Sequence, residues 1–130
     1  MVRGVINNTE RAKQINSFEG LQYGNITPTD LDGCIEYHNK AYIFMEIKYG
    51  DTQLPFGQRL ALERLVKDTG VTKKSIAIIA EHNIKNTDHQ IVVKDCIVRE
   101  LYLWNEKKWR SPNRDMTVKE LADTFITKIV

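Results

Sequence analysis

One short run of apolar residues constrains the fold more than any other feature, because it ends in charged residues that a buried strand seldom carries. The run extends from Tyr42 to Met45, and Glu46, Ile47 and Lys48 follow it. Successive side chains of a β-strand alternate between the two faces of its sheet. A strand over this stretch therefore places Glu46 and Lys48 on the same face.

A polar turn at residues 38–40 predicts that this strand pairs with an earlier one. The earlier strand is expected to begin near Pro28, because a proline at the first position of a strand removes no necessary ladder hydrogen bond. If the turn contains three residues, Tyr37 pairs with Ala41. A turn of two residues would shift the register and move side chains to the opposite face.

The three-residue turn brings acidic side chains together. It places Asp32 opposite Glu46 and Asp30 opposite Lys48, with directly opposed Cβ atoms about 4.5–5.5 Å apart. Two carboxylates at that distance repel each other unless one is protonated or a cation lies between them. A divalent cation held by oxygen ligands is the simplest remedy. The sequence therefore predicts a metal site here, on condition that the register holds.

The rest of the chain alternates between helix and strand patterns, which is typical of an α/β fold. We expect a helix from Asn8 or Thr9 to Ser17, a helix over 56–68 ended by Gly70, a buried parallel strand over 75–80, a strand over 91–103, and a helix opened by a capping box from Thr117 to Glu120. On the second helix, Gln58, Leu62 and Leu65 share one face. This order predicts a single domain over residues 1–130, an α/β sandwich with helices flanking a mixed sheet.

Composition limits the partners and the location. The chain has 130 residues and a formal net charge of +2, so a nucleic-acid partner can be argued only from local clusters of Lys and Arg. No stretch approaches the ~18 apolar residues of a transmembrane helix, and the first residues contain too short an apolar run for a signal peptide. We therefore expect a cytoplasmic protein that does not enter a membrane.

The spacing of Asp32 from Glu46-Ile47-Lys48 resembles that of the PD-(D/E)XK nuclease superfamily. The next stretch, from Tyr49 to Gln58, is similar to the VRR-NUC branch, in which a Gly-containing turn, a Leu and a helix-opening Gln follow the motif. The resemblance covers roughly residues 28–80. It implies a restriction-endonuclease-like sandwich with an αβββαβ-type core. Compact members include VRR-NUC proteins of bacteria and phages and Holliday junction resolvases, which act as homodimers.

The resemblance also implies a metal cofactor. Mg²⁺ or Mn²⁺ would be held by Asp32, Glu46 and the backbone carbonyl of Ile47. The Pro-x-Asp spelling of the motif nominates Asp30 instead, either in place of Asp32 or as an additional ligand. The hairpin register favours Asp32.

Further residues complete the site that the resemblance implies. Lys48 would orient the attacking water or neutralise charge on the phosphoryl group. Gln58 would orient that water or a phosphate, although a residue in the first turn of a helix can also simply satisfy its own backbone. Relatives often carry another acidic residue on a first helix beside the metal. Glu10 or Glu19 would fill this place; the alternative is an ordinary solvated carboxylate.

Two basic clusters are candidates for contact with nucleic acid. They are Lys73-Lys74 and the segment Lys107-Lys108-Trp109-Arg110. The cations would contact phosphate, and Trp104 or Trp109 would stack on an unpaired base. The alternative is a basic loop that is only solvated.

Together these features predict a Mg²⁺- or Mn²⁺-dependent endonuclease that hydrolyses DNA, with flapped, branched or Holliday junction DNA as the expected substrate. A restriction-like or nicking endonuclease is a second enzyme hypothesis, although the short chain leaves little room for a recognition domain. The rival from another class is a nucleic-acid-binding module that keeps the fold and lacks the chemistry. A buried ion-pair network without function would also explain Asp32, Glu46 and Lys48, but such networks gain little stability over apolar packing.

Overall fold

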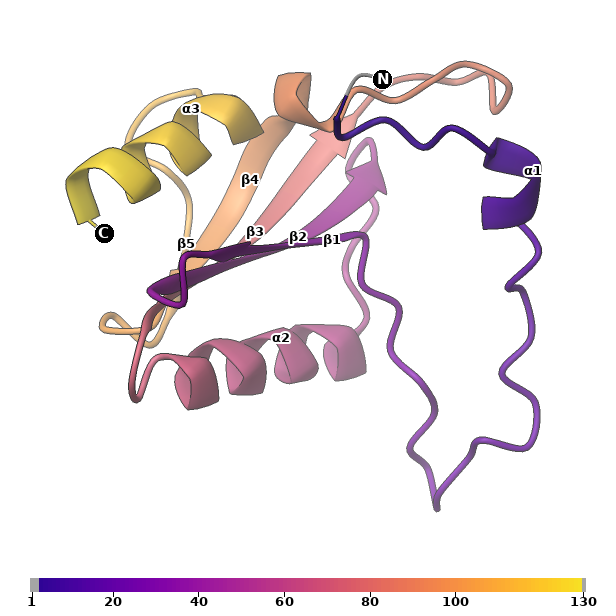
Figure 1. The fold of residues 1–130 in the computed structure, drawn as a ribbon, viewed down its shortest axis with the longest axis horizontal. Helices are drawn as coiled ribbons and strands as arrows, with labels where there is room; N and C mark the ends of the chain where they lie inside the picture. The colour runs from indigo at the N-terminus through magenta and orange to yellow at the C-terminus, as the bar shows by residue number, and fades with distance from the viewer. Residues whose placement is uncertain (1–2, 130) are drawn as a thin grey trace.

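The computed structural model describes residues 3–129 and has an α/β fold with a five-stranded mixed sheet (Figure 1). The strands follow chain order across the sheet: β1 (Gly33–Tyr37), β2 (Ala41–Tyr49), β3 (Lys74–His82), β4 (Ile97–Leu103) and β5 (Trp109–Arg110). The helices are α1 (Thr9–Ala12), α2 (Phe56–Thr69) and α3 (Val118–Thr124), which continues as a π-helical turn over Phe125–Ile129. The predicted α/β class is confirmed.

Two layers of helix enclose the sheet, with α2 on one face and α3 on the other (Figure 1). Strands β2 and β3 are parallel and α2 is the crossover between them, as predicted, whereas the other neighbouring strands are antiparallel. In the described part of the chain two strands precede α2, and not the three of an αβββαβ-type order. The strand expected over 91–103 begins only at Ile97, after a 3₁₀ turn at Val93–Asp95.

The turn between β1 and β2 contains three residues, and it gives the predicted register. Pairing extends from Tyr37 and Ala41 to Gly33 and Met45. One further step in the same register reaches Asp32. The turn is possible because two of its residues, at positions 38 and 39, adopt the left-handed backbone with φ values of 47° and 59°.

The first strand begins later than expected, at Gly33 and not at Pro28. All described residues before Gly33 are exposed. Here the side chain of Asp32 accepts the hydrogen bond of the Ile47 N–H. In a longer β1, a backbone carbonyl would accept that hydrogen bond, so the side chain takes the place of further backbone pairing. The segment from Pro28 to Asp32 is therefore an exposed lead-in to the sheet.

Strand β2 sends alternate side chains into two separate cores. Phe44 packs in the cluster beneath α2, together with Leu62. Ile43 packs in the cluster beneath α3. Because the faces alternate along a strand, Glu46 and Lys48 lie on the same face as Phe44, beneath α2.

Helix α2 confirms the predicted helix but turns a different face to the sheet. Leu62 and Val66 are buried, whereas Leu65, expected on the packed face, is 39% exposed. The backbone of Gly70, which follows the helix, has an ordinary helical φ of −74°. A glycine often follows a helix because the backbone there is left-handed, but that reason does not apply at this position.

The outer helices differ in how well the sequence predicts them. Asn8 caps α1, which ends at Ala12 and is shorter than expected, because no residue of this helix is buried to stabilise it. The predicted capping box between Thr117 and Glu120 opens α3. Among the residues described, no helix is long and apolar enough to cross a membrane.

Candidate active site

Glu46 is a buried carboxylate at the end of an apolar strand. Its residue is 4% exposed, although acidic side chains are rarely so buried without partners. It forms an ion pair with Lys48, whose Nζ lies 3.5 Å from Glu46 Oε1. The side chain of Lys48 is 21% exposed, so the pair is open to solvent on the lysine side. The predicted arrangement of these two residues on one face is confirmed.

Asp32, the residue just before β1, lies beside Glu46. Its Oδ2 accepts a hydrogen bond from the backbone N–H of Ile47, with a donor–acceptor distance of 2.7 Å. In an antiparallel pair the N–H and C=O of one residue point toward the same neighbouring strand. The carbonyl of Ile47 therefore also faces the side on which Asp32 lies, and β1 is too short to pair with it.

Burial and the neighbouring Asp32 perturb the carboxyl group of Glu46. The pKa of Glu46 is raised to about 7, first by burial and then by the negative charge of Asp32, while Lys48 acts in the opposite direction. The lysine alone thus fails to compensate for the burial of Glu46 beside a second carboxylate. The site has a deficit of positive charge at neutral pH and above.

Gln58 carries a buried oxygen on α2, the helix that covers this face of the sheet. Its Oε1 is buried and has no hydrogen-bond partner in the described part of the chain. Gln58 lies in the first turn of α2, which follows the end of β2 after a short loop over residues 50–55. Buried amide oxygens are almost always hydrogen-bonded, so this one is an acceptor that lacks its usual partner.

The structure does not bring the other acidic candidates into this arrangement. Asp30, expected opposite Lys48 on a strand, is exposed and lies before β1 begins. Glu10 and Glu19 are exposed as well, and Glu10 belongs to a helix with no buried residue. Of the two candidates in the lead-in segment, Asp32 is the one that reaches Glu46.

Lys73 and Lys74 lie at the far end of the sheet. Lys74 pairs with Ala41 at the beginning of β2, whereas Glu46 is near its end. The ammonium of Lys73 donates to a backbone carbonyl of the β1–β2 turn at 3.1 Å, and that of Lys74 to a carbonyl near the C-terminal end of α3's π-helical extension at 2.6 Å. These contacts fix both side chains away from the carboxylates.

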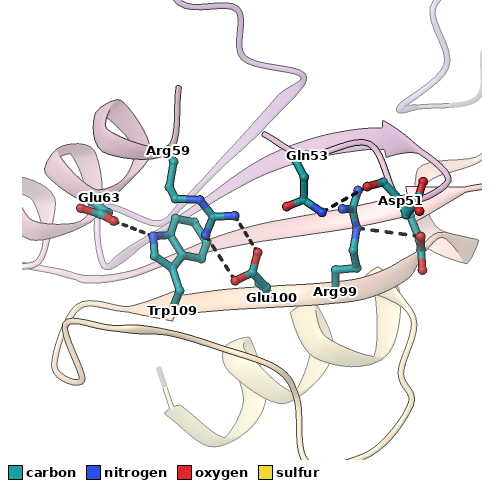
Figure 2. Close-up of polar contacts among 8 residues, drawn as sticks. Asp51, Gln53, Arg59, Glu63, Arg99, Glu100 and Trp109 are labelled. Carbon is teal, nitrogen blue, oxygen red and sulfur yellow. Dashed lines mark hydrogen bonds and ion pairs between the residues drawn. The ribbon is translucent and has the colours of Figure 1, made fainter. Parts of the chain in front are cut away.

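Trp109 is part of the packing between α2 and the sheet (Figure 2). Its Nε1 donates to Glu63 Oε1 at 2.7 Å, and the guanidinium carbon of Arg59 lies 4.8 Å from the centre of its ring. The ring also lies against Tyr102, with centroids 5.3 Å apart. An indole with these contacts is not a free platform for stacking on a base.

The cations next to Trp109 differ in whether they are paired or exposed. Arg110 Nε donates to Glu106 Oε1 at 2.6 Å, and this contact lowers the pKa of that carboxyl group. Lys107 and Lys108 are exposed. Within this segment, the exposed cations are therefore the two lysines.

Two further charged residues, not predicted from the sequence, lie on the same sheet face. Glu81 pairs with Lys48 across parallel strands, and Arg99 Nε lies 3.9 Å from Glu81 Oε2. Glu81 had a signal that sequence reasoning could have used, because it ends the apolar run 75–80 as Glu46 ends its own. Arg99 had none, because its orientation depends on a β-bulge in the pairing of β3 with β4.

The oxygen atoms near Glu46 match a magnesium site of the open kind. Within residues 3–129, His, Cys, Asp and Glu side chains do not gather in groups of three or more that could hold a metal. Mg²⁺, however, is often bound by one or two carboxylates with waters and substrate phosphates. Asp32, Glu46 and the Ile47 carbonyl fit that requirement.

Comparisons of the chain with protein-family models, with curated proteins and with solved structures found no match.

Proposed function

We propose that this chain is a Mg²⁺- or Mn²⁺-dependent nuclease of the PD-(D/E)XK type, which hydrolyses phosphodiester bonds of DNA. Branched DNA is its preferred substrate in this proposal, and a homodimer its assembly. The observation that carries the proposal is the hydrogen bond from the Ile47 N–H to Asp32, because it holds a second carboxylate beside the buried Glu46 and its partner Lys48.

The electrostatics of the site support a bound cation. Glu46 titrates near neutral pH because it is buried beside Asp32. A divalent cation between the two carboxylates would replace their repulsion with attraction and favour the charged form of Glu46. All the available donors are oxygen atoms, which are the ligands of hard cations such as Mg²⁺ and Mn²⁺.

Each residue has a part in hydrolysis. The cation, when bound by Asp32, Glu46 and the Ile47 carbonyl, would supply Lewis-acid stabilisation of the charge that develops at phosphorus. Lys48 places an ammonium group beside Glu46, where it stabilises negative charge on the phosphoryl oxygens. Gln58 Oε1 accepts a hydrogen bond from the attacking water and so directs its lone pair toward phosphorus.

The first test is cleavage of end-labelled four-way-junction, flap, duplex and single-stranded DNA, with Mg²⁺ or Mn²⁺ and with EDTA. Lys48→Ala is expected to abolish cleavage. Lys67→Ala is the matched control, because Lys67 is an exposed lysine of α2 outside the site. The substrate that is cut fastest identifies the class of nuclease, and sedimentation of the protein with that substrate measures its assembly.

A second test does not depend on the choice of substrate. Mn²⁺ is expected to raise the melting temperature of the wild type and not that of Glu46→Ala. Cleavage of none of the substrates, together with no metal-dependent shift, would contradict the proposal. Retained DNA binding in that case would favour the binding module without catalysis, whereas cutting at one sequence in linear duplex would favour the restriction-like alternative.

A further inference from the structure

Arg99, in β4, carries hydrogen-bond donors that the described protein does not satisfy. Its Nε and Nη2 atoms are buried and have no hydrogen-bond partner. Its ionic partner, Glu81, lies 3.9 Å away, which is beyond hydrogen-bond distance. Buried N–H groups almost always have an acceptor, so a guanidinium left in this state needs an explanation.

A β-bulge directs Arg99 to the face of the candidate active site. Ile79 pairs with Glu100 and Ala80 with Val98, so Arg99 is the extra residue in β4. Consecutive residues of a regular strand point to opposite faces, yet Figure 2 shows Arg99 and Glu100 both on the side of β4 toward α2. Bulges are frequent beside active sites, where they re-aim a side chain.

Arg59, on the same face, shows how this fold satisfies a structural arginine. It donates two hydrogen bonds to Glu100, at 2.8 and 3.3 Å, and its guanidinium lies over the ring of Trp109 (Figure 2). Arg99 has neither a bidentate carboxylate nor an aromatic ring. The contrast indicates that the acceptor for Arg99 comes from outside the chain.

We propose that Arg99 binds a backbone phosphate of the nucleic acid, to one side of the cleaved bond. The identification of this ligand as nucleic acid rests on the proposed nuclease function. The guanidinium fork matches the geometry of phosphate oxygens, and Arg99 provides the two unsatisfied donors for such a contact. Because these donors are buried, the side chains that cover them must move when a phosphate binds.

The spacing of the strands sets which phosphate Arg99 meets. Strand β4 is two positions from β2 in the sheet, and neighbouring strands are about 4.8 Å apart, so Arg99 lies about 10 Å to the side of Glu46. Arg99 therefore takes a flanking phosphate, while Lys48 serves the scissile one.

The test measures binding of a fluorescein-labelled DNA duplex by anisotropy, with Ca²⁺ in place of Mg²⁺, over a series of salt concentrations. Arg99→Gln is expected to weaken binding about tenfold and to lower the slope of log affinity against log salt by about 1, the signature of one lost phosphate contact. Arg99→Lys should keep the slope and lose part of the affinity. Arg64→Gln removes an exposed arginine of α2 and should change neither quantity.

Folding and ligand identity are controlled separately. Arg99→Met is expected to melt no lower than the wild type, because it removes donors that are buried without acceptors. Inorganic phosphate should raise the melting temperature of the wild type and of Arg64→Gln, but not that of Arg99→Gln. An unchanged salt slope in a folded Arg99→Gln overturns the inference even if the wild type cuts DNA. So does a wild type that neither binds DNA nor responds to phosphate. A slope that depends on Arg99, without cleavage, upholds the phosphate site and refutes the nuclease.

Discussion

Glu46 links the stability of the folded protein to pH. Its pKa is raised to about 7 in the folded state, from an ordinary value of 4.5. Between these values the folded protein keeps a proton that the unfolded chain releases. Stability therefore falls as pH rises through this window, and the full cost of the charged carboxylate is present above pH 7.

Replacement of this carboxylate should stabilise the metal-free protein at high pH. We expect Glu46→Gln to raise the free energy of unfolding by about 1–3 kcal/mol at pH 8 and to change it little at pH 4. Urea denaturation in EDTA at pH 4, 6 and 8 measures the effect. Glu19→Gln, at an exposed position, is the control and should show no trend. A gain of equal size at every pH would contradict the titration of Glu46.

At the scale of elements, α2 depends on a close approach at its C-terminal end. A Cβ atom added to Gly70 would overlap Trp104 and lie 2.7 Å from the carbonyl oxygen of Val66. Gly57, in the first turn of the same helix, has open space around the same position. The two glycines therefore serve different purposes, and only the one at the end is required by packing.

These two positions provide a matched pair of substitutions. Gly70→Ala is expected to lower the free energy of unfolding by about 1–3 kcal/mol, because Trp104 must move. Gly57→Ala is expected to raise it by about 0.5–1 kcal/mol, because alanine lowers the entropy of the unfolded chain and favours helix. Chemical denaturation of both variants tests this. Equal effects in one direction would contradict the contact with Trp104.

A second prediction concerns the attachment of α2 to β5. Trp109→Phe removes the hydrogen bond to Glu63 and is expected to cost about 1 kcal/mol of stability. Affinity for single-stranded DNA should not change, because the indole is engaged within the protein. A loss of affinity without a loss of stability would instead support the stacking role suggested by its basic neighbours.

For the molecule as a whole, the division between the arm before β1 and the rest is the dominant feature. Every described residue from 3 to 32 is exposed, and Figure 1 shows this segment as a long excursion away from the sheet and its helices. A chain that begins at Thr27 should therefore unfold with the same urea dependence as the full chain. Its free energy of unfolding in water should lie within about 0.5 kcal/mol of that of the full chain. A large loss would show that the arm contributes to the core.

The parts of this fold that the sequence predicts are those set by local rules. Turn length and the alternation of side chains were sufficient to give the register of β1 and β2, which brings Asp32 beside Glu46, and helical spacing was sufficient for the existence of α2. The start of β1 was not predictable in this way, because it depends on a side chain that bonds to the backbone of another strand. The orientation of Arg99 depends on a bulge in the pairing of β3 with β4, which no local pattern reveals. The prediction that Leu65 packs on the sheet was wrong, because packing and not periodicity sets the rotation of α2 about its axis.

The hydrogen bond between Asp32 and the Ile47 N–H also makes a single backbone amide a reporter of the site. This amide ties the last residue of an exposed arm to β2. Its proton should exchange slowly with solvent deuterium while Asp32 is in place and rapidly once that carboxylate swings away. One resonance in an NMR spectrum thus records how often the site is assembled, before any metal or substrate is added.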